Sequence, residues 1–313
     1  MASKNKTSGA DDSIKGFLKD YDLSILDSGK PKSSPIKTLP DLLSLNAKNL
    51  EGVIHESLCA HSEYFPIAHA THKENWNRWV INKYSLPNGN ITDFAYVLST
   101  SSQSTIVLME IEEPTKRMWR GSAEKPTRDA AFTAAIEQVN RWRSCLNDPA
   151  NLTKTISDLS KIFGASPMRM NEFNIKYVLV YGRSNENISD AQKKLFNQTR
   201  SDLLAQDIQL YTYDNLVDAA ETRKDPRRHN FVKIRATGPV IAFKYQYLNV
   251  EPKNEFSYLL PGSLILDADV ERLLKSKGFD IDSWKNGKLL SVHRKSPVES
   301  LEKSFPELFK KKP

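Results

Sequence analysis

The sequence predicts an α/β fold in which helices flank a mixed β-sheet. Two observations carry this prediction. Short apolar runs alternate with helical periodicities along residues 40–222, and two of the runs are joined by a short polar segment, as in a hairpin. A hairpin followed by a crossover helix gives a sheet with both antiparallel and parallel neighbours. The chain has 313 residues, of which 39% are apolar and 27% charged, so it is long enough to bury such a core.

The first half of this region is expected to form a helix and three strands. Spacings of three and four between apolar residues predict helix over 41–64, in one or two pieces. Strands are predicted at 79–81, 92–98 and 104–112, with a Pro-Asn-Gly-Asn turn separating the first two. The last of these strands contains an uninterrupted apolar run, so it is expected to be covered on both faces.

The second half is expected to continue as helix, strand, helix, strand. Pro114 ends the third strand, and a basic, irregular loop is predicted at 116–126. A long helix is predicted at 127–146, followed by a buried strand at 177–181. Ser189 can cap a helix that runs to about residue 205. A strand at 208–211 and a short helix at 214–221 complete the series.

Composition divides the chain into three parts. Residues 1–39 are rich in Ser, Lys, Gly, Asp and Pro, and we expect a flexible arm. Residues 40–222 form the main domain. Residues 223–313 form a C-terminal extension or small module, with strand patterns at 240–247 and 263–266 and a helix at 267–277. This part opens with a cluster of basic residues: Arg223, Lys224, Arg227, Arg228, Lys233 and Arg235. Such a run is usually a solvated face, with phosphate binding as the alternative.

The composition also excludes several classes of protein. Cys59 and Cys145 are too few for a disulfide framework, and the chain has no CxxC pair for zinc. No apolar leader or run long enough to span a membrane is present, so we expect a cytoplasmic protein without a membrane partner. The net charge of +7 and pI of about 9.1 favour a polyanionic partner only slightly.

Three carboxylates stand at the ends of two successive predicted strands. Asp93 opens one strand, and Glu110 and Glu112 end the next. Residues two apart on a strand point to the same face, and a hairpin can bring Asp93 beside them. Oxygen ligands at a strand end suit Mg²⁺ or Mn²⁺, which activate water and neutralise charge on a phosphodiester. Gln138, on the long helix, could orient a water or a carboxylate.

Less specific interpretations stand beside this one. Glu110 and Glu112 alone could be a solvated strand end, and Gln138 could bond to backbone. Glu51 and Glu56 on the first helix could complete a metal site, but an exposed helix face is the simpler interpretation. The pair His69 and His72 has no evident third ligand.

The order of these residues resembles the PD-(D/E)XK nucleases, whose fold is that of the restriction endonucleases. More narrowly, the chain resembles the Shedu family of bacterial anti-phage defence proteins, over roughly residues 45–222. The stretches that carry the resemblance are 93–94, 107–114, 133–143, 178–183 and 211–216. The resemblance implies a metal-dependent DNA endonuclease in a homo-oligomer, a dimer or tetramer. It implies that Asp93, Glu110, Glu112 and Gln138 form the catalytic site, with the first three holding Mg²⁺ or Mn²⁺.

One position departs from the general nuclease motif, which has Lys where this chain has Glu112. Lys116 could supply the missing cation. The alternative function is therefore a catalytically weakened DNA-binding or sensing module, or an oligomeric scaffold, on the same fold. Basic residues on either side of the predicted site are expected to contact the DNA backbone: Lys116, Arg117, Arg120, Arg227 and Arg228.

Overall fold

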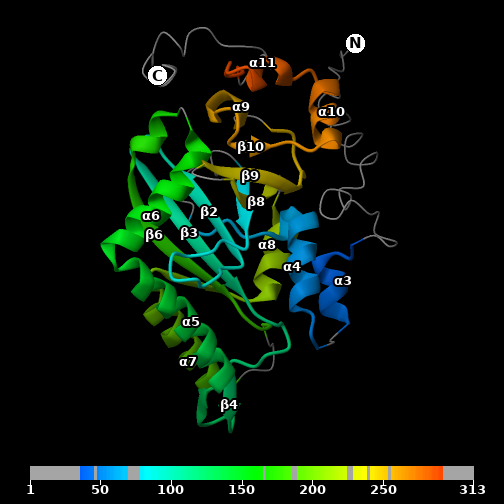
Figure 1. Cartoon of the computed structure of the whole chain (residues 1–313). Helices are drawn as coiled ribbons and strands as arrows, with labels where there is room; N and C mark the ends of the chain where they lie inside the picture. Colours follow the sequence, from blue (N-terminus) through cyan, green and yellow to red (C-terminus); the bar gives the residue numbers. More distant parts are fainter. Residues whose placement is uncertain are drawn as a thin grey trace, which may run out of the picture.

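A computed structural model describes residues 36–45, 48–69, 78–164, 166–184, 189–223, 228–237, 240–252 and 255–291. Most of the predicted flexible arm therefore lies outside the described residues. The centre of the molecule is an eight-stranded mixed sheet with the strand order β10-β9-β8-β1-β2-β3-β6-β7 (Figure 1). The predicted fold class, a mixed sheet flanked by helices, is confirmed.

The sheet and its helices have the following bounds. The strands of the main sheet are β1 (Trp79–Asn82), β2 (Phe94–Ser99), β3 (Gln103–Ile111), β6 (Glu172–Val180), β7 (Ile208–Tyr211), β8 (Asn230–Thr237), β9 (Val240–Tyr247) and β10 (Leu264–Ile265). The main helices are α3 (Leu39–Ser44), α4 (Glu51–Ala60), α5 (Ala130–Leu146), α6 (Pro149–Leu159), α7 (Asp190–Leu204), α8 (Tyr213–Thr222), α10 (Ala268–Ser276) and α11 (Ile281–Lys285). Shorter elements are α9 (Glu255–Tyr258), the 3-10 turns Ser62–Tyr64, Ser160–Phe163 and Pro167–Met170, and a separate hairpin of β4 (Trp119–Gly121) and β5 (Pro126–Arg128).

The hairpin of β2 and β3 lies in the middle of the sheet. The two strands are antiparallel, and Phe94 at the start of β2 stands opposite Met109 near the end of β3. After α5 and α6 the chain returns as β6, which runs parallel to β3 along its whole length. The apolar run Ile106 to Met109 is fully buried, because neighbouring strands cover its edges and helices cover both of its faces.

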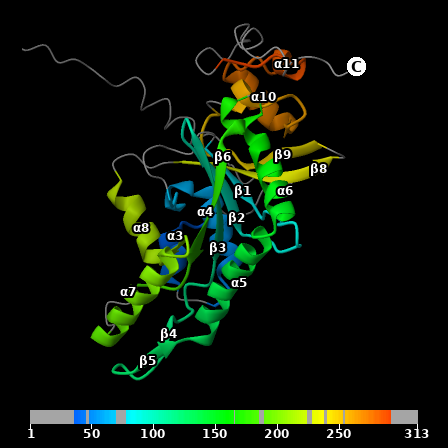
Figure 2. The same cartoon turned by 90° about the vertical axis from the view of Figure 1, so that its left-hand side faces the viewer.

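Two apolar layers hold the helices on the sheet. On one face, Phe132 and Val139 of α5 pack with Leu108 of β3, and α7 lies on the same side. On the other face, Ile54 of α4 packs with Met109, together with residues of α3 and α8. Figure 2 shows α5 and α8 on opposite sides of the sheet. The first predicted helix is in two pieces, α3 and α4, and Ser189 caps α7 as expected.

The C-terminal part of the chain continues the same sheet. Strand β8 runs parallel to β1, β9 pairs antiparallel with β8, and β10 adds at the edge. The predicted boundary near residue 222 therefore falls within one continuous sheet, and the division into domains stays a prediction. The described part of the basic stretch, which we interpreted as a solvated face or a phosphate-binding segment, forms much of β8.

The basic loop is more regular than predicted. It contains the β4–β5 hairpin, and Figures 1 and 2 both place this hairpin at the end of the molecule away from α11. Helix α5 begins at Ala130 rather than at 127, because the Asp129 side chain accepts a hydrogen bond from the backbone of Ala131 and caps the helix there. Within the described residues, we find no helix that combines the length and the apolar character needed to cross a bilayer.

Candidate functional site

Asp93, Glu110 and Glu112 lie together where β2 begins and β3 ends; we call them the acidic strand end. Asp93 directly precedes β2, and Glu112 directly follows β3. Because Phe94 stands opposite Met109, the antiparallel register brings Asp93 to the level of Glu110. The predicted juxtaposition of the three residues is therefore present in the structure.

Asp93 is held by contacts on both of its oxygens. Its Oδ2 accepts a hydrogen bond from the backbone nitrogen of Ile111 at 2.8 Å, which continues the β2–β3 ladder past its last residue pair. Its Oδ1 forms an ion pair with the Nζ of Lys83. Lys83 follows β1 in the left-handed region, with φ of 52°, and its backbone nitrogen bonds to the carbonyl of Asp93. These contacts fix the carboxylate against the sheet.

Glu110 is the most strongly perturbed group of the site. Only 8% of the residue is exposed, and its carboxylate accepts a hydrogen bond from the amide of Gln138 on α5. Burial, together with the negative charges of Asp93 and Glu112, raises the pKa of Glu110 to about 9. In this arrangement Glu110 keeps its proton at neutral pH. Gln138 is thus brought to the acidic strand end, as predicted.

Glu112 points to a different partner. Its carboxylate forms an ion pair with the Nζ of Lys116, and its backbone carbonyl accepts a hydrogen bond from the Tyr213 hydroxyl at 2.6 Å. Gly182, with φ of 62°, follows β6 close by, and a Cβ there would lie 2.8 Å from the carbonyl of Lys116. Only glycine therefore allows the loop that carries Lys116 to approach the end of β6 this closely.

Helix α4 brings two further groups to this region. Glu51 has a raised pKa, caused by burial and then by the charges of Asp93 and Glu112. The imidazole of His55 stacks on Phe94 with ring centroids 4.4 Å apart, and burial lowers the pKa of His55. Both residues line a cavity of about 280 Å³ that also contains Asp93 and Lys83. Glu51 is therefore part of the site rather than an exposed helix position.

The carboxylates of this region have the chemistry of a divalent-cation site. They are oxygen ligands of the type that Mg²⁺ and Mn²⁺ take, and their charges act on one another, so a cation would relieve their repulsion. Among the described residues, however, no three His, Cys, Asp or Glu side chains gather closely enough to hold an ion. Lys83, Gln138 and Lys116 instead each contact one of the carboxylates. The residues fit a divalent cation by their chemistry, and binding would require the two lysines to move aside.

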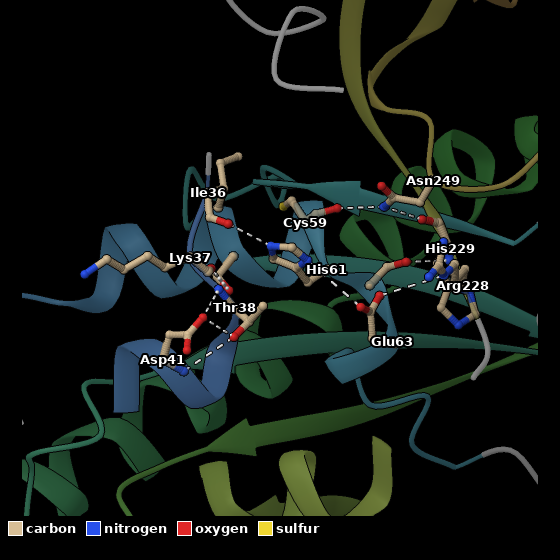
Figure 3. A network of polar contacts seen from close by, with 12 residues as sticks. Ile36, Lys37, Thr38, Asp41, Cys59, His61, Glu63, Arg228, His229 and Asn249 are labelled. Carbon is tan, nitrogen blue, oxygen red and sulfur yellow. Dashed lines mark hydrogen bonds and ion pairs between the residues drawn. The ribbon is translucent and has the colours of Figure 1, made fainter. Parts of the chain in front are cut away.

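The basic residues predicted to contact DNA separate into two groups. Lys116, Arg117 and Arg120 line a cleft of about 680 Å³ beside the acidic strand end. Arg228 instead lies 3.9 Å from the carboxylate of Glu63, in the polar network that joins the segment after α4 to the start of β8 (Figure 3). Arg227 lies outside the described residues. The structure therefore places the first group, but not Arg228, next to the candidate site.

Lys83 and His55 are the members of the site that the sequence did not reveal. Lys83 stands in a turn ten residues before Asp93, and no spacing rule connects the two. His55 is one residue among several on a buried helix face. His69 and His72 are the histidine pair for which the sequence offered no third ligand. The Nε2 of His69 forms a hydrogen bond with the carbonyl of Tyr177, so this residue has a structural role. His72 lies outside the described residues.

The raised pKa of Glu110 predicts a pH-dependent stability in the metal-free protein. Between 4.5, the pKa of an unperturbed glutamate, and about 9, the folded chain binds a proton that the unfolded chain has released. Stability is therefore expected to fall as pH rises through this window, by up to ~1.4 kcal/mol per pH unit. Urea unfolding of the wild type and Glu110→Gln in chelator, at pH 5 to 9, measures this contribution.

The Glu110→Gln variant is expected to lose stability less steeply with pH, because the amide has no proton to release. Glu172→Gln is the matched control, since Glu172 is exposed at the other end of the parallel β3–β6 pair. Equal slopes for the wild type and Glu110→Gln would show that Glu110 is ionised in the folded chain.

The fold and the site together define an α/β protein whose central hairpin ends in a cluster of partly buried carboxylates. Residues 14–217, which are 204 of the 313, match the family model described as Shedu protein SduA, C-terminal. The chain therefore belongs to the Shedu family, and this membership links it to anti-phage defence. No curated protein matches the chain at a significant level.

Proposed function

We propose that this protein is a DNA endonuclease of anti-phage defence that uses Mg²⁺ or Mn²⁺ to cut or nick its substrate. The observation that carries the proposal is the state of Glu110: a buried carboxylate, surrounded by other carboxylates, whose pKa is raised to about 9. Its ionised form costs free energy in this surrounding unless a cation is bound, and groups with such shifted pKa values concentrate at functional sites. The family membership supports the same conclusion.

Each residue of the site has a role in this proposal. Asp93, Glu110 and Glu112 would hold the cation, and Gln138 orients the Glu110 carboxylate through its amide. A bound divalent cation supplies an activated water and offsets charge on the phosphodiester. Lys83 and Lys116, now paired with the carboxylates, are near enough to bind the phosphate when they are released. Arg117 and Arg120 would hold the DNA backbone.

The test is plasmid nicking by the purified full chain with Mg²⁺, with Mn²⁺, and with chelator. Conversion of supercoiled to open-circle or linear DNA only in the presence of metal is the expected result. If supercoiled DNA persists at every metal concentration while the protein remains folded, the endonuclease proposal is wrong.

A second candidate is favoured by the two ion pairs at the acidic strand end. Lys83 and Lys116 already balance the charges of Asp93 and Glu112 without a metal, so the same residues could serve a DNA-binding or sensing module. Such a module would bind DNA with a strong salt dependence and leave it uncut. A chain that neither cuts nor binds DNA would instead fit the oligomeric scaffold.

The general nuclease motif has a lysine where this chain has Glu112, and we expect Lys83 to take the role of that lysine. Lys83 contacts Asp93 through its Nζ and lines the same cavity, so it can approach a phosphate oxygen beside the carboxylates. Lys83→Ala is expected to lower the single-turnover cleavage rate by about a hundredfold. The control is Lys176→Ala, because Lys176 lies in β6 and pairs with Asp207. If cleavage slows in Lys116→Ala but not in Lys83→Ala, the role belongs to Lys116.

We also propose a homo-oligomer, a dimer or a tetramer, as the resemblance implies. The basic faces of several copies could then engage one duplex, which would strengthen binding by multivalency. Light scattering at micromolar concentration tests this proposal, and a monomer mass would contradict it.

A further inference from the structure

The cleft beside the acidic strand end, which we call the basic cleft, is lined by both cationic and aromatic residues. It is formed by the loop after β3, strand β4, the segment after β6 and the first turns of α7. Its volume of about 680 Å³ lies in the range of pockets that bind small molecules or single monomers of a polymer.

The charge of the basic cleft is positive. Lys116, Arg117, Arg120 and Arg183 line it, against one carboxylate, that of Asp129. Lys116 is paired with Glu112, and Arg183 is held in a fork by Asp214 at 2.6 to 3.0 Å. The guanidinium groups of Arg117 and Arg120 are exposed, and we find no ion pair for either within the described part of the chain. These two are the groups most available to an anion.

Two aromatic side chains stand among these cations. Trp119 of β4 packs edge-on against Phe132, with ring centroids 5.8 Å apart, and remains only partly buried. Phe196 of α7 packs against the same core and is also partly buried. Both side chains are therefore anchored in the core, and both residues line the cleft. Anchored aromatic rings beside cations are the arrangement that single-stranded nucleic acids use, because bases stack on the rings and phosphates meet the cations.

A base-paired duplex cannot use this arrangement. In a duplex the faces of each base are covered by its neighbours, so only its edges and the phosphates are accessible to a side chain. A ring in a cleft can reach the face of a base only when that base has left the stack. An aromatic wall would therefore discriminate between paired and unpaired nucleotides, whereas arginines alone would not.

We propose that the basic cleft binds an unpaired nucleotide of a DNA strand, with its base against Phe196 and Trp119 and its phosphates on Arg117 and Arg120. Lys116 links the cleft to the acidic strand end, since it lines the cleft while its Nζ contacts Glu112. A strand held in the cleft thus continues toward the carboxylates. This inference rests on the proposed function and names its substrate: single-stranded, flapped or frayed DNA.

The test is binding of labelled oligo-dT and of a blunt duplex of equal length, measured by fluorescence anisotropy with the full chain in chelator, so that no cleavage is involved. Phe196→Leu keeps an apolar side chain in the core but removes the ring. We expect this variant to weaken binding of oligo-dT about tenfold and to leave the duplex within about twofold. The matched control is Phe173→Leu, because Phe173 packs against the same core without lining the cleft; it should leave both affinities unchanged.

A second pair of variants tests the phosphate contacts. Arg117→Ala and Arg120→Ala should each reduce the salt dependence of oligo-dT binding by about 0.7 in the slope of log K against log salt. The control is Arg169→Ala, since exposed Arg169 precedes β6 at the end of the strand away from the cleft.

The outcomes separate this inference from the proposed function. The inference is wrong if the wild type does not bind oligo-dT or if Phe196→Leu binds oligo-dT as tightly as the wild type. It is also wrong if Phe196→Leu loses equal affinity for oligo-dT and for the duplex. Each of these outcomes would overturn it even if the protein cuts plasmid. A loss of affinity in Phe196→Leu that is confined to oligo-dT supports the inference, even if no metal gives cleavage. A change of similar size in Phe173→Leu would assign the effect to core packing and would also overturn it.

Discussion

Glu110→Gln is expected to eliminate metal-dependent cleavage while leaving the fold intact. The amide has nearly the volume of the carboxyl and can still contact Gln138, but it cannot carry the charge that attracts a divalent cation. Loss of a group that merely supports a metal ligand typically costs 10–100-fold, so loss of a ligand itself should lower the cleavage rate by more than about a hundredfold. Single-turnover cleavage over a metal titration measures the effect.

Folding of this variant can be checked separately. In chelator, Glu110→Gln should unfold at the same or a higher temperature than the wild type at pH 7 or above, because it removes a buried group that resists ionisation. Glu137→Gln is a matched control on the exposed face of α5, one residue from Gln138, and should cleave normally. Wild-type cleavage by a folded Glu110→Gln protein would show that the acidic strand end is not the metal site.

Much of the fold could be predicted because its central elements have strong local signals. The apolar run Ile106 to Met109 can be accommodated only in a strand covered on both faces, and the structure places it there. The spacing of Ala131, Ala135, Val139 and Trp142 predicts one apolar face of a helix; the last three are buried in α5, whereas Ala131 in its first turn is exposed. The hairpin register then brings Asp93 to Glu110 without further information.

Elements whose pairing is distant or whose side chains are polar were less predictable. Strand β8 alternates Val232 and Ile234 with Lys233 and Arg235, and its charges led us to interpret it as a basic surface. Its partner β1 lies about 150 residues earlier, and nothing local indicates that parallel pairing. The β4–β5 hairpin has strands of three residues each, too short to show an apolar alternation.

The partners of charged residues were the least predictable part of the site. Sequence places a carboxylate or a lysine, but tertiary structure decides which charges meet. Lys83 meets Asp93 through the turn after β1, and Arg228 meets Glu63 rather than an open surface. A count of basic residues therefore indicated a nucleic-acid partner without indicating which of those residues remain available to it.

Glu112 distinguishes an active site from a decayed one. Its carboxylate lies close enough to Glu110 to raise the pKa of that group, and Lys116 is the cation that now balances it. If Glu112 is a ligand, Glu112→Gln weakens the attraction for a divalent cation but leaves Asp93 and Glu110 in place. We then expect cleavage to require about 10–100 times more metal, or to disappear. Glu113→Gln, one residue further along the chain, is the matched control.

The opposite expectation follows if Glu112 replaces an ancestral lysine and the site has lost its activity. The wild type would then fail to cut, and Glu112→Lys would restore cleavage, because a cation at that position offsets the charge that develops on the phosphate. With Glu112 as a ligand, Glu112→Lys instead places a positive charge beside the metal and releases Lys116 from its ion pair, so the variant should be inactive. We expect the ligand behaviour, because Glu112 acts on Glu110 and Glu51 alike. Identical metal titrations for the wild type and Glu112→Gln would contradict it.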